Sequence, residues 1–173
     1  GGLSKVSLED LPSASMATSI IAYNGIGEFS YLELQKALTG KNFSVQPSID
    51  DYREAISAST TVKDFESMMQ CVYLYLTSPR QDDQAYQSLI SMLETQLAAR
   101  DKNPKNAFND SIQQTITSHS PRTLIVDVDM LKKVDQLKAI QIYKERFANP
   151  ADFFVTFIGN INPNDEATRQ IIC

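Results

Sequence analysis

The sequence has little of what metal and thiol chemistry needs, with a single histidine, His119, and two cysteines, Cys71 and Cys173, among 173 residues. Zinc catalysis needs about three protein ligands, most often including histidine, and an open position for water. One histidine therefore excludes a zinc motif built on two histidines, in either orientation. No Cys-x-x-Cys pair is present either.

The two cysteines indicate little about the redox compartment. Cys71 lies within an apolar helical pattern, where a buried and inert thiol is expected rather than a nucleophile. We do not expect a disulfide between Cys71 and Cys173, because stray pairs are rare outside disulfide-rich scaffolds.

The chain also lacks long apolar runs and an excess of positive charge. No stretch approaches the roughly 18 apolar residues of a membrane-spanning helix, so we expect no membrane span. A net charge of −5 argues against nucleic acid as a partner, because nucleic-acid binding needs a basic patch. The content of 42% hydrophobic and 21% charged residues is typical of a globular protein. A chain of this length fits one domain that buries roughly 70% of its unfolded surface.

Helical patterns dominate the sequence, and several carry start or stop signals. Ser30-x-x-Glu33 is a capping box, and Asn103-Pro104 places a cap before a proline suited to a first helical turn. We expect helices over residues 13–23, 30–40, 61–78, 82–100, 104 onward, 127–133, 135–147 and 162 onward.

The helix predicted over residues 61–78 is apolar on two sides. Leu74, with Cys71 beside it, falls near the face opposite the main stripe, and such a helix is either buried between layers or covered by another domain. We therefore expect a partner surface at Leu74 or, if the fourth helix covers Leu74, at an open sheet edge. For the main stripe we expect a core role rather than a binding role. That stripe consists of Phe65, Met68, Met69, Val72 and Leu76.

Two alternating segments, residues 42–48 and 52–59, predict a β-hairpin with its turn at residues 49–51. Residues 152–159 are apolar on both faces, which predicts a central strand. Together these patterns predict an α+β fold, with helices packed on a small, mainly antiparallel sheet.

Other candidate sites favour structural interpretations. His119 lies in a predicted loop without a chemical partner nearby, so we interpret it as a solvated loop histidine rather than a general base or ligand. Gly25-Ile26-Gly27 follows a helix and lacks the third glycine of a phosphate loop, which indicates a tight turn. The acidic pairs at residues 50–51 and 82–83 are typical of a turn and a helix start rather than of a calcium site.

Several motifs, read in order from about Gly2 to Ile172, resemble one domain of the insulinase/pitrilysin family of zinc peptidases. The resemblance is closest to the third of four homologous domains in bacterial members. The motifs that carry it include Gly25-x-Gly27-x-Phe29-Ser30-x-x-Glu33-Leu34, Tyr75-x-Thr77-x-Pro79-Arg80-x-Asp82, Asn103-Pro104 and Tyr143-Lys144-x-Arg146-Phe147.

The resemblance implies a degenerate copy without a metal site. Active domains of the family carry His-x-x-Glu-His on the first helix, and the matching positions here are Ser13, Met16 and Ala17. The position of the downstream glutamate ligand falls on Gln96 when Asn103-Pro104 anchors the match. We therefore expect no catalytic or metal-binding residue and no cofactor in this segment, with zinc in the first domain of the parent protein.

The resemblance further implies that residues 1–173 form a single insulinase-type domain, with the fold of insulinase and mitochondrial processing peptidase, as a fragment truncated at both ends. The opening strands of the family are missing, so the sheet would have an unpaired edge. The expected function is to help form the peptide-enclosing chamber and the interdomain contacts of a bacterial zinc metalloendopeptidase. Its partners would be sibling domains of the same polypeptide and the peptide substrate of the parent enzyme.

Two alternatives remain open at this point. One is a structural or assembly domain of a wholly inactive peptidase relative, and the other is a free-standing peptide-binding module. A periplasmic or cell-envelope location is suggested by the family resemblance only.

Overall fold

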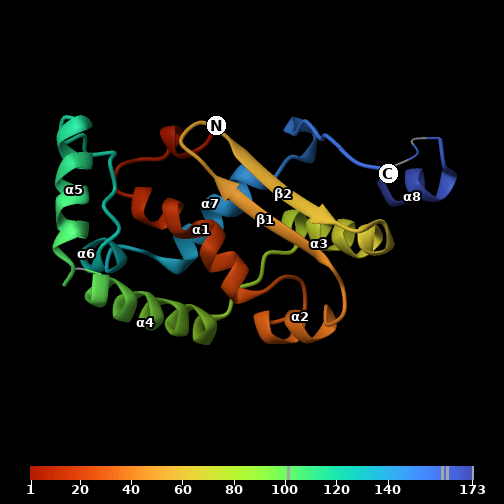
Figure 1. Cartoon of the computed structure of the whole chain (residues 1–173), viewed down its shortest axis with the longest axis horizontal. Helices are drawn as coiled ribbons and strands as arrows, with labels where there is room; N and C mark the ends of the chain where they lie inside the picture. The colour runs from red at the N-terminus through yellow and green to blue at the C-terminus, as the bar shows by residue number, and fades with distance from the viewer. Residues whose placement is uncertain (101, 161, 163, 173) are drawn as a thin grey trace.

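The structure is a computed structural model that describes residues 1–100, 102–160, 162 and 164–172. It consists of helices packed around a β-hairpin, as Figure 1 shows, in agreement with the predicted α+β class. The strands are β1 (Phe43–Ile49) and β2 (Glu54–Thr60). The α-helices, and the 3₁₀ helices marked η, are η1 (Leu3–Lys5), α1 (Leu11–Asn24), α2 (Tyr31–Ala37), η2 (Val62–Asp64), α3 (Phe65–Thr77), α4 (Asp83–Arg100), α5 (Pro104–Ile116), α6 (Val128–Leu131), α7 (Gln136–Phe147), η3 (Pro150–Asp152) and α8 (Glu166–Ile172).

The helix caps predicted at Ser30 and Asn103 are confirmed. The Ser30 side chain accepts a hydrogen bond from the Glu33 backbone N–H, and the Glu33 carboxylate accepts one from the Ser30 N–H, which completes the capping box of α2. The Asn103 side chain accepts a hydrogen bond from the Lys105 backbone N–H at the start of α5, and the Asp135 side chain accepts one from the Lys138 N–H at the start of α7. Each such cap stabilises its helix by about 1 kcal/mol.

The predicted hairpin is also confirmed. β1 and β2 are antiparallel, with Phe43 opposite Thr60 and Ile49 opposite Glu54. Since side chains alternate between the faces of a strand, Val45 and Ile56 share the face that packs on the core. Helix α3 packs on both strands and α1 packs on β1.

The centre of the core lies between α1 and α7. Tyr143 and Phe147 of α7 are almost completely buried, and their rings stack with centroids 4.5 Å apart. The Tyr143 hydroxyl donates a hydrogen bond of 3.1 Å to the carbonyl oxygen of Tyr75, which joins α7 to α3. Burial raises the pKa of Tyr143, so this hydroxyl remains a donor across the physiological range.

The prediction of a strand over residues 152–159 is wrong. Residues 150–152 form η3, and residues 153–158 belong to no helix or strand. Phe154 and Ile158 are 94% and 93% exposed. Apolar composition predicts a strand, but a strand forms only where a neighbour supplies backbone partners, and no other described segment pairs with this one.

The prediction for the faces of α3 needs correction. The most buried positions are Phe65, Met68, Cys71 and Tyr75. Cys71 therefore belongs to the core, which confirms the buried thiol that was expected, and it forms no outer face with Leu74. Leu74 is half-buried, and its side chain lies against the loop at Gly27. The apolar face that lacks cover is formed by the other half of the predicted stripe, Met69, Val72 and Leu76.

The last helix begins later than predicted. α8 starts at Glu166, and the Asp165 carboxylate before it accepts the Thr168 N–H at 2.9 Å. Residues 101, 161, 163 and 173 lie outside the described residues, so the expectation about a disulfide between Cys71 and Cys173 stays a prediction.

Candidate functional site

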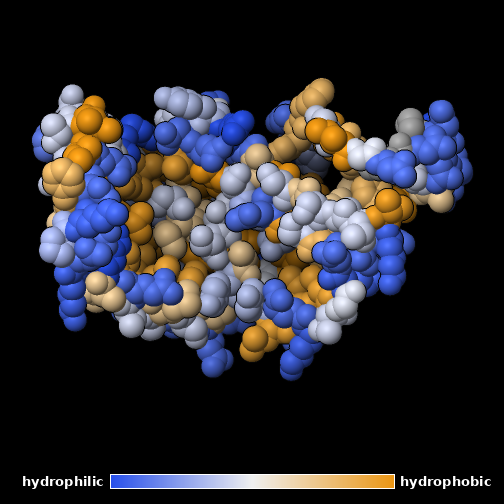
Figure 2. Space-filling model, viewed as in Figure 1, coloured by the Kyte–Doolittle hydropathy of each residue, from blue (hydrophilic) through white to orange (hydrophobic). Residues whose placement is uncertain are grey.

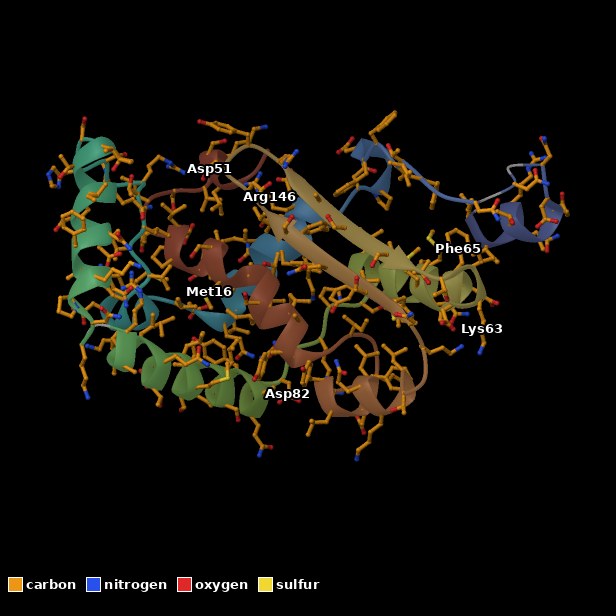
Figure 3. All side chains as sticks on the ribbon, viewed as in Figure 1. Met16, Asp51, Lys63, Phe65, Asp82 and Arg146 are labelled. Carbon is orange, nitrogen blue, oxygen red and sulfur yellow. The ribbon has the colours of Figure 1, made fainter. Side chains whose placement is uncertain are left out.

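The three first-helix positions predicted from the family motif are packed into the interior. Ser13, Met16 and Ala17 lie on α1 with exposed fractions of 2%, 8% and 0%. The Ser13 hydroxyl accepts a hydrogen bond of 2.9 Å from the Asp135 N–H at the start of α7. Met16 belongs to the main hydrophobic core, and Figure 3 labels it on α1. These side chains lie in the packed interior, where α1 contacts α7.

Gln96, the fourth predicted position, does not join them. It is exposed on α4, while the neighbouring Leu93 and Leu97 direct that helix toward the core. Within residues 1–100, 102–160, 162 and 164–172, no three His, Cys, Asp or Glu side chains gather as metal ligands would. That the chain binds no zinc stays a prediction.

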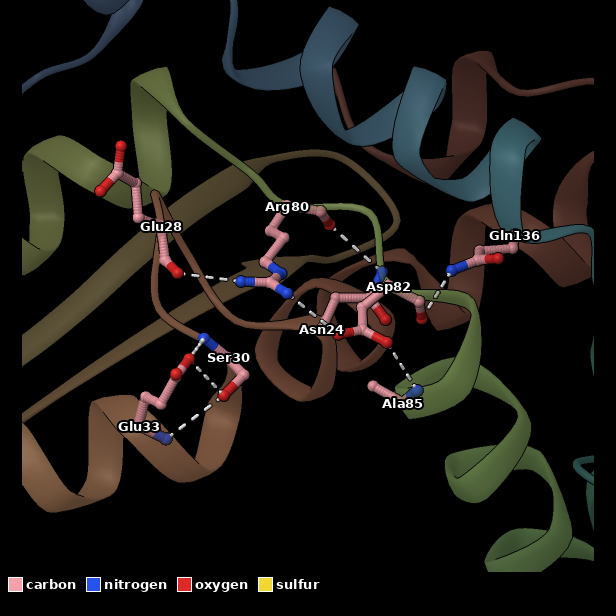
Figure 4. Close-up of polar contacts among 8 residues, drawn as sticks. All are labelled: Asn24, Glu28, Ser30, Glu33, Arg80, Asp82, Ala85 and Gln136. Carbon is pink, nitrogen blue, oxygen red and sulfur yellow. Dashed lines mark hydrogen bonds and ion pairs between the residues drawn. The ribbon is translucent and has the colours of Figure 1, made fainter.

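Two of the motifs that carry the family resemblance meet at a polar joint, drawn in Figure 4. The Arg80 guanidinium donates to the Glu28 carbonyl oxygen at 2.9 Å and pairs with the Asp82 carboxylate at 3.3 Å. The Asn24 amide donates to the Arg80 carbonyl oxygen at 3.2 Å, and the Gln136 amide donates to that of Asp82 at 3.1 Å. The joint therefore connects the end of α1, the start of α4 and the start of α7.

The glycines of the first motif form the tight turn that was predicted. Gly25 has φ of 91°, and a Cβ there would lie 2.1 Å from the Phe29 carbonyl oxygen, so only glycine fits. The Gly27 N–H donates to the Ser78 carbonyl oxygen at 2.8 Å, which docks this turn on the loop after α3. The motif is a structural connection rather than a ligand loop.

The remaining candidate residues have structural surroundings. His119 is exposed in the loop after α5, with φ of 53°, and its backbone N–H donates a hydrogen bond to the Gln114 carbonyl oxygen. Cys71 is buried, and burial raises the pKa of its thiol. The buried Asp64 carboxylate accepts a bond from the Asn42 N–H at 2.9 Å, and this bond holds the pKa of Asp64 below its usual value.

A wide groove is a further feature that the sequence analysis did not predict. It has a volume of about 1230 Å³ and lies between β2, α3, α8 and the extended residues 153–158. Its apolar lining includes Ile56, Met69, Val72, Leu76, Phe157 and Ile171. Figure 2 shows hydrophobic surface on this side of the molecule, beside the hairpin and the chain leading to α8. Two sequence features could have indicated the groove. One is the apolar segment 153–158, and the other is the part of the predicted α3 stripe formed by Met69, Val72 and Leu76.

The sequence is 26% identical over 164 residues to "Zinc protease PQQL-like" of Arabidopsis thaliana, which covers 94% of this chain and 15% of that protein. The structure matches the periplasmic protease PqqL from Escherichia coli with a TM-score of 0.67 and 18% sequence identity, over 87% of this chain and 17% of that one. No family model matches the sequence.

The chain is therefore homologous to a segment of insulinase-family zinc proteases of the PqqL type, which confirms the predicted resemblance. It spans less than a fifth of the length of these relatives. In the part of the chain that the structure describes, no helix is long and apolar enough to cross a membrane.

Proposed function

We propose that this chain is a non-catalytic domain of a zinc metalloendopeptidase, which helps to form the peptide-enclosing chamber and contacts sibling domains. The observation that carries the proposal is the burial of Ser13, Met16 and Ala17 in a helix of the protease fold. A catalytic zinc needs ligands that converge on a cavity with an open position for water. Here those positions carry small or apolar side chains that serve packing.

The free energy needed to bury a charged side chain in α1 supports the same function. Ala17 and Ile20 are completely buried, and Met16 nearly so. A glutamate at position 16, which would be the base of an active domain, would have to be desolvated without a metal or a cation beside it. Homology to a segment of a zinc protease, together with the burial of Ser13, Met16 and Ala17, supports a role as chamber wall rather than as catalyst.

A structural domain in a wholly inactive relative is the first alternative. The second is a peptide-binding module, and the apolar groove beside β2 is the observation that favours it. The complete reading frame that encodes this chain separates these cases. A His-x-x-Glu-His motif a few hundred residues before Gly1 supports the active protease, and its absence supports the inactive relative.

The biochemical test uses the purified chain. We expect elemental analysis to find less than stoichiometric zinc after dialysis, and we expect no cleavage of a quenched fluorescent peptide. One tightly held zinc per chain, or cleavage that a chelator abolishes and that follows the chain through purification, would contradict the proposal.

A further inference from the structure

The dipeptide Asn24-Gly25 ends α1 and belongs to the polar joint of Figure 4. Gly25 cannot be replaced without strain, because its φ is 91° and a Cβ there would lie 2.1 Å from the Phe29 carbonyl oxygen. Asn24 is completely buried, and its amide nitrogen donates to the Arg80 carbonyl oxygen at 3.2 Å. The fold therefore requires a glycine directly after a buried asparagine.

An asparagine that precedes glycine is open to deamidation, because glycine has no side chain to obstruct the backbone nitrogen that attacks. A base removes the proton of the Gly25 N–H, and this nitrogen attacks Cγ of Asn24. The new N–Cγ bond forms as the Cγ–Nδ2 bond breaks, and Nδ2 leaves as ammonia after taking a proton from water. Water then opens the five-membered succinimide at either carbonyl, which gives aspartate or isoaspartate. The net reaction is the hydrolysis of one amide.

In the folded chain both reacting groups are held in hydrogen bonds. The Gly25 N–H donates to the Ile21 carbonyl oxygen at 3.1 Å, and Nδ2 of Asn24 donates to the Arg80 carbonyl oxygen. Ring closure would break both bonds. It would also require an anionic nitrogen to form beside a side chain that is 0% exposed, which is unfavourable away from water. The reaction therefore needs the last turn of α1 to separate from the loop that contains Arg80.

The products do not fit the joint. An aspartate would place an acceptor where Nδ2 now donates to the Arg80 carbonyl oxygen, and the Oδ1 atom of Asn24 already lacks a hydrogen-bond partner among the described residues. The Arg80 guanidinium is paired with Asp82 at 3.3 Å, so the new buried charge would compete for it. An isoaspartate would add a methylene to the backbone before Gly25, where the Phe29 carbonyl oxygen leaves no room.

We propose that Asn24 is a deamidation site that the folded joint keeps unreactive, and that the reaction prevents the chain from folding again. Opening of the joint exposes the dipeptide, and conversion of Asn24 then makes the opening irreversible. The site depends only on residues of this chain, so zinc binding or peptide cleavage by the chain would refute the proposed function and leave this site unaffected.

Mass spectrometry of the complete 173-residue chain tests the first part. The chain is incubated at mildly alkaline pH in buffer and in guanidinium chloride, and then digested with trypsin. The expected peptide spans residues 6–36, in which Asn24 is the only asparagine. We expect Asn24 to be converted about a hundredfold faster or more in denaturant, because the folded joint opens only rarely. Equal rates in the two conditions, or no conversion in denaturant, would overturn the proposal.

Arg80→Ala tests whether the joint provides the protection. The variant loses the bond to the Glu28 carbonyl oxygen and the ion pair with Asp82. We expect the conversion of Asn24 in buffer to become about fivefold faster, as for a loss of about 1 kcal/mol, with no change in denaturant. Arg53→Ala, which removes an exposed ion pair in the hairpin turn, is the matched control and is expected to change neither rate.

Gln136→Leu removes the bond to the Asp82 carbonyl oxygen and takes the place of Arg80→Ala if that variant does not fold. An unchanged rate in buffer for a folded joint variant, or an equal increase for Arg53→Ala, would overturn the role of the joint.

Refolding tests the second part. After long incubation in denaturant the chain is diluted into buffer, and the folded fraction is separated from the unfolded fraction by size-exclusion chromatography. We expect the folded fraction to retain Asn24 and the unfolded fraction to contain aspartate and isoaspartate at this position. Equal shares of the products in both fractions would contradict the proposal, because the deamidated chain would then fold as well as the original.

Discussion

Replacing Ala17 with histidine tests whether the first helix can still hold a metal ligand. Ala17 is completely buried on the side of α1 that packs on α7, and it belongs to the main core. Histidine adds a ring and polar nitrogens to a site with no free volume. Overpacking of this kind costs about 1–3 kcal/mol. For a chain of this length each kcal/mol lowers the melting temperature by about 2–4 °C, so we expect a decrease of about 2–12 °C.

Ser19→His is the matched control, because Ser19 is on the same helix and exposed. Exposed substitutions of this kind stay within about 0.5 kcal/mol. Thermal unfolding followed by circular dichroism measures both variants, with and without added zinc. The reasoning is refuted if Ala17→His melts with the parent chain, or if zinc raises the melting temperature of Ala17→His but not that of Ser19→His.

Three further predictions concern single side chains. Tyr143→Phe removes the hydrogen bond to the buried Tyr75 carbonyl oxygen, and we expect urea unfolding to give a loss of about 1–2 kcal/mol; an unchanged midpoint would contradict this. The lowered pKa of Asp64 means that its ionised carboxylate contributes stability above about pH 4, and that this contribution is lost as the pH falls through the folded-state pKa. Asp64→Asn should therefore lose stability at neutral pH and show a smaller further loss on acidification than the parent chain; parallel pH profiles would refute the assignment. Since burial raises the pKa of Cys71, this thiol should react slowly with a thiol reagent in the folded chain and rapidly in denaturant; peptide mapping of the labelled site separates it from Cys173.

The sequence alone determined the helix caps and the hairpin. Ser30 with Glu33, Asn103 with Pro104, and Asp135 act on backbone groups within three residues of themselves, so the signal and its effect lie in one short segment. The hairpin was predictable for the same reason, because its two strands are joined by a short turn.

Part of the candidate site could also be read from the sequence. One histidine is too few for a two-histidine zinc motif in any fold, and the order of the motifs predicted the homology that the comparisons found. The position of Gln96 could not be predicted from the sequence. Gln96 is exposed on α4, whereas Ser13, Met16 and Ala17 are buried in the interior. Convergence of side chains from two helices depends on how those helices rotate against each other.

The tertiary structure alone decided which apolar surfaces are covered. Residues 153–158 have the composition of a central strand, yet they remain unpaired because backbone pairing needs a neighbour in space. The same holds for α3, whose apolar side chains are divided between the core, as at Cys71 and Tyr75, and the open groove, as at Met69 and Val72. Periodicity identifies a face as apolar, but burial depends on what packs against that face, and only the arrangement of the whole chain supplies that information.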